Sequence, residues 1–433
     1  MKTVYIVHVI DTEGPLAEKT LFEEYSHQNS PAFVPNDFSN LKDVIGRHRK
    51  NVLGSWEQIF KMLRDVTSEK NRNSLLDSFG GGWKFNWFCM DHVGFKENPR
   101  RRLMGYHEIH DFYSELVNSQ KMGDVLHWHY HPMSTYREAN KCSTDFLTSE
   151  LHEGLCRKLI DRNFFPSAYR AGFQDVRPDS HWFREQWIPF DLTNTASQDL
   201  LEEDNPDLVH GRFSDWRWAP DDWSTYYPHP RNHQIPGDCR SKIGRCLNIL
   251  NRFANLDETE IEKAFQRAQS GRSTLLSFAG HDWRDLNVEI AYFKKILVQV
   301  ARKFPDVKFK YADVVEAFNA VHPEPSAPPL ELECSVVFND LGYPEKVRVI
   351  QKKGKIFGSQ PFFAVQTRSK KYLFQNMNYG ATPEEFHFVF DDQSILPDDV
   401  RAIGVASNDA QGFQSKHVIR LDEDRSHQKK ILF

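Results

Sequence analysis

Four sets of polar residues in this 433-residue chain each follow a segment that reads as a β-strand. Each set contains side chains that can bind a metal ion, move a proton or hold a carboxylate in place. Because α/β proteins build their sites at the carboxyl ends of parallel strands, these four positions are the natural candidates for chemistry.

The first set is Asp11-Thr12-Glu13-Gly14-Pro15, directly after the β-branched run at residues 3–10. Two carboxylates within three residues can divide into a general base and a metal ligand. An acidic turn before Gly-Pro is, taken alone, more often simple turn chemistry. Asp11 and Glu13 are therefore candidates that need support from elsewhere in the chain.

The second set is His127, His129 and His131, which end a predicted strand at about residues 124–130. A strand has a period of two, so all three imidazoles project to one face. Imidazoles spaced in this way can share one metal ion. The alternative is a hydrogen-bonded histidine-rich loop. We favour a metal site, and the pattern leaves open which two histidines bind.

The third and fourth sets each contain one candidate. Arg170, in Tyr-Arg-Ala-Gly-Phe, could orient a carboxylate such as Asp11 by bidentate pairing, although a surface arginine is the more frequent outcome. His281 ends the run Ser-Phe-Ala-Gly-His and could act as a general acid, with Asp282 as its support. The alternative for His281 is a structural or surface histidine.

The elements that must position these residues alternate between strand and helix. Helical stripes of apolar residues separate the strand-like runs, which indicates a parallel sheet, closed as a barrel or open, with helices outside. Two long segments, 14–50 and 203–250, fit the alternation poorly and are interpreted as excursions. The predicted strands lie at residues 3–10, 83–90, 124–130, 167–170, 188–192, 273–278 and 307–311.

A proline-rich segment divides the chain. Four prolines fall within residues 323–329, which predicts a stiff linker at 322–330 between a domain at 1–321 and a smaller one at 331–433. Short β-rich runs with turn signals between them predict an all-β sandwich for the smaller domain. These runs are 331–338, 345–351, 361–367, 371–375, 385–390, 401–406 and 416–421.

Composition narrows the class of protein. Fifty-five basic and sixty acidic residues give a formal charge of −5, which argues against a large nucleic-acid surface. No apolar run approaches the length of a transmembrane segment, and no secretion signal is evident. The six cysteines have no regular spacing and are interpreted as reduced thiols. A cytoplasmic protein is expected.

Residues 215–227 form an aromatic-rich stretch that contains Trp218 and Trp223. Aromatic faces suit the apolar faces of sugar rings, so these two residues are candidates for substrate binding. The alternative is that the aromatic side chains fix a long loop to the barrel.

Taken jointly and in this order, the four sets resemble the motifs of the polysaccharide deacetylases, the NodB-homology carbohydrate esterases. In that family a strand-end acidic pair is followed by a histidine pair ending in proline, an arginine motif and a late Leu-x-Leu-His. The resemblance spans about the first three-quarters of the chain. It is closest to the lipopolysaccharide and O-antigen biosynthesis branch, and it implies an irregular (β/α)7 barrel.

The resemblance also implies roles for single residues. Asp11 would be the catalytic base, Arg170 would hold it, and His281 would be the general acid. Glu13, His129 and His131 would bind a divalent metal, commonly zinc. The usual His-x-x-x-His-Pro spacing would select His127 in place of His129.

The sequence departs from the family pattern at two further points. Gly172 stands where the arginine motif usually has proline. The aspartate that supports the catalytic histidine has three candidates, Asp191, Asp215 and Asp222.

The implied activity is hydrolysis of an N-acyl group, with acetyl as the default, from a sugar in surface-polysaccharide biosynthesis. The substrate would be an N-acylated sugar, a nucleotide sugar or a lipid-linked glycan. Two alternatives remain: a carbohydrate-binding protein without activity on the same scaffold, and a hydrolase of small amides or formamides.

Overall fold

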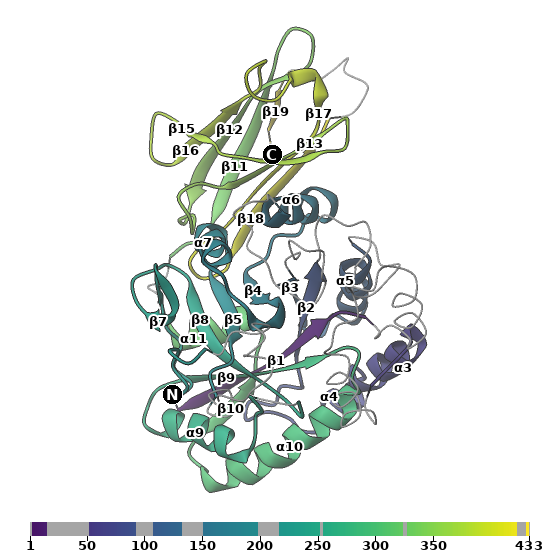
Figure 1. Ribbon diagram of the computed structural model, residues 1–433, viewed down its shortest axis with the longest axis vertical. Coiled ribbons are helices and arrows are strands. Elements are labelled where there is room, and N and C mark those ends of the chain that lie inside the picture. The colour runs from purple at the N-terminus through teal and green to yellow at the C-terminus, as the bar shows by residue number, and fades with distance from the viewer. Residues whose placement is uncertain are drawn as a thin grey trace, which may run out of the picture.

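The structure is a computed structural model that describes residues 2–14, 52–91, 107–131, 150–197, 216–251, 254–323, 327–421 and 430–432. Within these ranges the chain forms a parallel α/β barrel followed by an antiparallel β domain (Figure 1). None of the described helices is both long and apolar enough to cross a membrane.

The barrel is one parallel sheet that closes on itself. Strand β1 pairs with β2 on one edge and with β9 on the other, which closes a ring of seven strands. Strand β10 pairs with the first residues of β1, beside the start of the β1–β2 pairing. The predicted α/β barrel is thereby confirmed, and the sheet is closed. Its strands are β1 (Thr3–Thr12), β2 (Phe85–Asp91), β3 (Val125–Tyr130), β4 (Ala168–Ala171), β5 (Phe190–Asn194), β8 (Lys242–Asn248), β9 (Thr274–His281) and β10 (Lys308–Tyr311).

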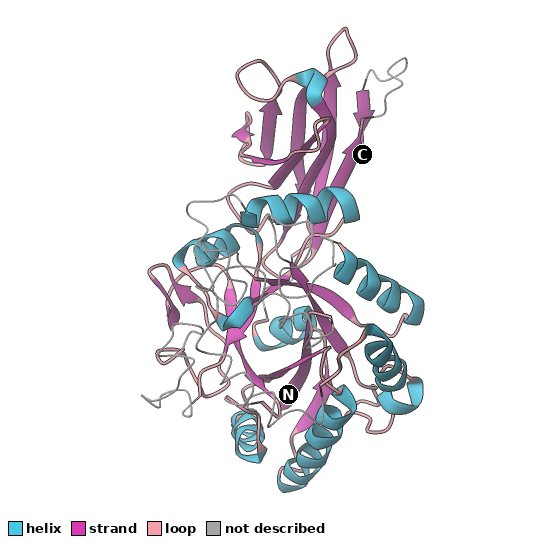
Figure 2. Ribbon diagram, turned by 45° about the vertical axis from the view of Figure 1, so that its right-hand side comes forward, coloured by secondary structure: helices cyan, strands magenta, loops and turns pink. Residues whose placement is uncertain are grey.

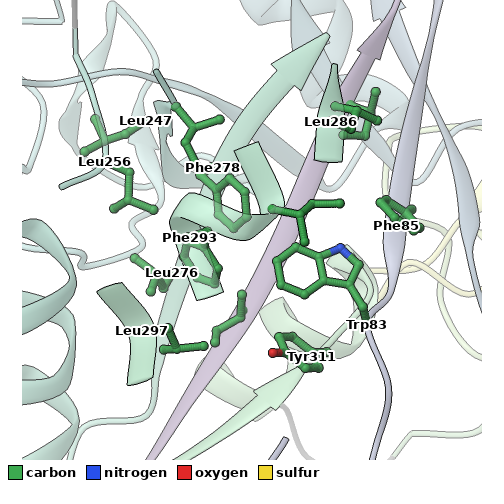
Figure 3. Packing of buried hydrophobic residues seen from close by; sticks show 14 of the residues in the cluster. Trp83, Phe85, Leu247, Leu256, Leu276, Phe278, Leu286, Phe293, Leu297 and Tyr311 are labelled. Carbon is green, nitrogen blue, oxygen red and sulfur yellow. The ribbon is translucent and has the colours of Figure 1, made fainter. Parts of the chain in front are cut away.

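Alternation along each strand sorts side chains between the inside of the barrel and the helices around it. In β1, Val7 and Val9 belong to the interior cluster, whereas Ile6 and Ile10 belong to the outer one. The outer cluster continues through Trp83 and other large side chains packed between the strands and α10 (Figure 3). Both faces of the strands are thus buried, as expected for a parallel sheet.

Helices cover the outside of the barrel (Figure 2). Helix α11 (Val314–Val321) adds to the interior cluster, where Phe318 stacks on Phe190 at the start of β5 with ring centroids 4.6 Å apart. The other described helices are α3 (Trp56–Val66), α4 (Glu69–Arg72), α5 (Glu108–Gln120), α6 (Glu150–Arg162), η3 (Gly172–Gln174), α7 (Pro178–Trp187), α9 (Glu258–Gln269) and α10 (Leu286–Lys303).

One part of the predicted layout is wrong. Residues 203–250 were expected to be a single excursion, but 242–248 form the barrel strand β8, every residue of which is buried. This strand contains Lys242 and Arg245, which hide its apolar pattern. Arg245 is satisfied within the protein by the Ala196 carbonyl and the Glu260 carboxylate, so its burial carries no unpaired charge. The excursion proper contains the hairpin of β6 (Pro228–His229) and β7 (Asn232–Pro236). Residues 15–51, which hold most of the first expected excursion, lie outside the described residues.

The β domain contains two antiparallel sheets that share one hydrophobic cluster. The seven predicted runs each correspond to a strand, while β15 and β19 escaped prediction because they are only two and three residues long. One sheet has β11 (Glu331–Phe338), β12 (Pro344–Lys353), β15 (Asn378–Tyr379), β16 (Glu385–Val389) and β19 (Lys430–Leu432), and the other has β13 (Phe362–Thr367), β14 (Tyr372–Gln375), β17 (Val400–Asn408) and β18 (Gln414–Arg420). A short 3-10 helix, η5 (Pro397–Asp399), precedes β17.

The described cysteines are all free thiols: Cys89, Cys156, Cys239, Cys246 and Cys334. Cys142 lies outside the described residues.

Candidate metal centre

The barrel register brings the four predicted sets of polar residues to the same end. Asp11 at the end of β1 pairs with His281 at the end of β9. Beyond β2 in the ring, His129 of β3 pairs with Arg170 of β4. Glu13 follows β1 directly and His131 follows β3, so all six side chains converge at the carboxyl edge.

Glu13, His129 and His131 form the one described group with the donor set and geometry of a metal site. The two imidazole Nε2 atoms lie 2.9 Å apart, and the Glu13 Oε1 atom lies 3.8 Å from His129 Nε2 and 3.5 Å from His131 Nε2. A tetrahedral zinc ion with bonds of about 2.0–2.2 Å separates its ligand atoms by about 3.3–3.6 Å. The three distances lie around that value, so the residues present fit a zinc ion.

His129 is oriented by a backbone contact. Its Nδ1 atom lies 3.0 Å from the Arg170 carbonyl oxygen, which assigns the ring proton to Nδ1. The Nε2 lone pair is then directed toward Glu13 and His131. A metal-binding histidine is usually held in this way through its second nitrogen.

His131 is oriented by close packing. The ring lies against Gly172, where an added Cβ atom would come within 2.5 Å of the His131 Cγ and Nδ1 atoms. Only glycine leaves room for the ring in this position. The departure from the family pattern at residue 172 therefore has a steric reason in this chain.

His127 shares the strand face of the other two histidines but not their contacts. It lies one pleat deeper in the barrel, with its ring centroid 4.8 Å from that of Phe88. Burial lowers the pKa of His127 to about 3, and its two ring nitrogens have no hydrogen-bond partner among the described residues. The structure places His129, and not His127, beside Glu13.

Asp11 is buried and paired with Arg170. The Arg170 Nε atom donates to Asp11 Oδ2 at 2.9 Å, and its Nη1 atom donates to the Leu192 carbonyl. Burial alone would raise the pKa of Asp11, but the charge of Arg170 and its hydrogen bond, together with the neighbouring His129 and His281 rings, outweigh burial and leave that pKa below its usual value. An ionised carboxylate beside a metal site can act as a general base.

His281 completes the set from the opposite side. Its Nε2 atom lies 4.0 Å from both Asp11 Oδ2 and Glu13 Oε1, and its ring packs on Trp283. Burial lowers the pKa of His281 to about 4, although Glu13 and Asp11 both act to raise it. The imidazole is therefore neutral at pH 7 in the structure.

The two described candidates for the carboxylate partner of His281 make their contacts elsewhere. Asp191 pairs with Arg184 and accepts hydrogen bonds from Thr193, which lies on the same strand. Asp222 accepts from Ser224 and pairs with Arg267 on helix α9. Asp215 lies outside the described residues.

Asp282 was predicted to support its neighbour His281, and this prediction is wrong. Asp282 instead binds the turn that carries Glu13 and Gly14. Its carboxylate accepts hydrogen bonds from the backbone N–H groups of Glu13 and Gly14 and from the Tyr113 hydroxyl, at 2.8 to 3.1 Å. Gly14 has a φ of +74°, a conformation that glycine adopts without strain. Asp282 therefore fixes the turn that presents Glu13, a contact between residues 269 positions apart in the chain.

The two candidate tryptophans have different environments. Trp218 is 67% exposed, and its backbone N–H donates to the Gln234 side chain. Trp223 is 1% exposed, donates from Nε1 to the Glu260 carbonyl and has the Arg245 guanidinium over its ring. Trp223 thus fixes the excursion to the barrel, and the prediction that it contacts substrate is wrong in this structure.

No family model and no curated protein matches the sequence. Among solved structures, a protein from Mycobacterium smegmatis assigned as a polysaccharide deacetylase aligns with a TM-score of 0.34 and 10% identity, covering 76% of this chain and 94% of the other. A PuuE allantoinase aligns with a TM-score of 0.37 and 12% identity, covering 75% and 92%. Similarity at this level does not identify a family, so the site is interpreted from its own residues.

Proposed function

We propose that this chain is a metal-dependent amide hydrolase of the NodB-homology type and that Zn²⁺ is its metal. The observation that carries the proposal is the cluster of Glu13, His129 and His131, with a paired Asp11 and a partly exposed His281 within 4.0 Å of it. Asp11 would supply the base, His281 the acid, and the cluster three metal-binding side chains, all at one end of the barrel.

A zinc ion bound there would polarise the amide carbonyl and lower the pKa of a bound water to about 7. Asp11 is suited to remove the proton from that water because Arg170 keeps its carboxylate ionised. His281 lies close enough to Asp11 to receive that proton and to pass it to the departing amine nitrogen. Water and amide would then give a carboxylate and an amine, with no other reactant.

The substrate class is proposed from the sequence resemblance together with Trp218. An N-acetyl sugar, presented as a nucleotide sugar or a lipid-linked glycan, suits the family motifs that the chain carries. The narrower role in lipopolysaccharide or O-antigen biosynthesis is proposed from the Asp-x-Glu and His-x-His-Pro forms of the first two motifs. The exposed face of Trp218 is a surface on which a sugar ring can stack.

The test is release of a primary amine from a substrate panel by the zinc-loaded chain. The panel contains N-acetylated nucleotide sugars, lipid-linked N-acetyl sugars, free N-acetyl sugars, and small cyclic amides and formamides. We expect turnover of one sugar class and its loss in Asp11→Asn. Turnover of the small amides alone would contradict the sugar assignment, and no turnover of any member with zinc fully bound would contradict the proposed hydrolase.

A further inference from the structure

The β domain contacts the barrel beyond the linker that joins them. The turn between β17 and β18, residues 409–413, lies against the starts of barrel strands. A Cβ atom added at Gly412 would come within 2.7 Å of the Phe190 ring at the start of β5. From β8, Lys242 donates to the Ala410 carbonyl. The turn therefore fits closely against the amino-terminal end of the barrel.

Asn408, at the end of β17, binds the residues that lead into β4. Its side-chain amide donates to the Pro166 carbonyl at 2.8 Å and to the Trp187 carbonyl at 2.7 Å, and its oxygen accepts from the Ser167 hydroxyl at 2.9 Å. Asn408 is fully buried, so these bonds are shielded from water. One side chain of the β domain thus joins the segment before β4 to the end of helix α7.

Strand β4 is short and contacts three parts of the metal centre. Arg170, in β4 and within four residues of Ser167, makes two of these contacts. Its guanidinium donates to Asp11, and its carbonyl oxygen contacts the His129 ring. Gly172, directly after the strand, packs on the His131 ring. A displacement of β4 would move the partner of the base and the supports of both imidazoles together.

The helices on either side of β4 pack on the same part of the β domain (Figures 1 and 2). Gly404 of β17 lies against Leu159 of α6, where an added Cβ atom would come within 2.9 Å of the leucine side chain. Trp187 of α7 packs on Phe362 of β13 with ring centroids 5.2 Å apart. The outer face of the β13–β17 pair is therefore covered by the barrel and cannot serve as a glycan-binding face.

We propose that the β domain sets the geometry of the metal centre, with Asn408 as a positioning residue that acts through β4. This inference rests on the proposed function, because it requires that Glu13, His129 and His131 bind zinc. It assigns the domain a role in holding the site, in place of an accessory sugar-binding module on this face.

The test compares zinc affinity in Asn408→Ala and Asn339→Ala, both in the full chain. Asn339, in the turn between β11 and β12, also makes local side-chain hydrogen bonds, because its Oδ1 atom accepts from the backbone N–H groups of Leu341 and Tyr343. Zinc affinity is measured by competition with a chromophoric chelator, well below the unfolding temperature of each variant. We expect Asn408→Ala to weaken zinc binding by about tenfold, as for loss of a supporting contact. Asn339→Ala should bind zinc as the unmodified chain does.

Ser167→Ala provides a milder second variant if Asn408→Ala does not fold, because it removes the hydroxyl that Asn408 and Gln414 both contact. Weaker zinc binding in Asn408→Ala or Ser167→Ala, with zinc binding of Asn339→Ala unchanged, supports the inference. If the unmodified chain binds zinc and the folded Asn408→Ala and Ser167→Ala variants bind it equally well, the inference is overturned. The proposed function is then unaffected. Absence of zinc binding by the unmodified chain overturns both.

Discussion

Gly172→Ala should damage the metal centre although it replaces none of the proposed ligands. The new Cβ atom would lie 2.5 Å from His131 Cγ and Nδ1, whereas ordinary contact begins at 3.4 Å. The ring or the β4 backbone would have to move by about 0.9 Å, and zinc bond lengths tolerate changes of about 0.2 Å. We expect zinc affinity to fall by about 10- to 100-fold, the range seen when the support of a metal ligand is lost.

The assay is a zinc titration against a competing chelator, with the folded fraction of each variant checked by circular dichroism. Gly54→Ala is the matched control, because a Cβ atom at residue 54 meets only one side-chain atom, at 4.0 Å. If Gly172→Ala is folded and binds zinc as tightly as the control, His131 is not a ligand and the reasoning is refuted.

Further predictions concern the roles of single residues. Glu13→Gln should lose zinc, whereas Asp11→Asn should retain zinc and lose turnover. Atomic absorption on each purified variant measures the zinc content. Equal zinc content in the two variants would contradict the assignment of Glu13 as a ligand and Asp11 as the base. Trp218→Ala should raise KM with little change in the unfolding midpoint, and an unchanged KM would rule out a sugar contact. The pKa values of buried His8 and His127 are lowered to about 3, so unfolding takes up protons between pH 3 and 6.5. The free energy of unfolding of the zinc-free chain should therefore fall as pH drops below 6.5, by about 1.4 kcal/mol per pH unit for each histidine, and level off above it. Denaturant titrations of the chain and of His127→Leu test this, and an unchanged slope in the variant would contradict it.

The parts of the fold that the sequence predicts are those encoded locally. Period-two alternation and apolar runs identify the predicted barrel strands to within a few residues, and each candidate set lies at the carboxyl end of a strand as expected. The convergence of Asp11, Glu13, His129, Arg170 and His281 follows because parallel strands present their carboxyl ends at one edge.

The parts that the sequence does not predict depend on partners distant in the chain. Strand β8 reads as polar because it contains Lys242 and Arg245. The groups that satisfy the buried Arg245, the Ala196 carbonyl and the Glu260 carboxylate, lie elsewhere in the chain. Asp282 looks like a partner of His281, its neighbour, until the fold brings Glu13 to it. Trp223 resembles a surface aromatic residue until Arg245 and helix α9 cover it. No local pattern signals the contacts of Asn408 with Pro166 and Ser167, which lie just before β4.

X-ray absorption at the zinc edge tests the central claim, that Glu13, His129 and His131 hold zinc, most directly. The chain loaded with one equivalent of zinc should show a first shell of nitrogen and oxygen only, at about 2.0–2.2 Å, with the signature of two imidazoles. One imidazole should disappear in His129→Ala, and none in His127→Leu. A sulfur shell at about 2.3 Å, or an imidazole lost with His127 and kept without His129, would contradict the account.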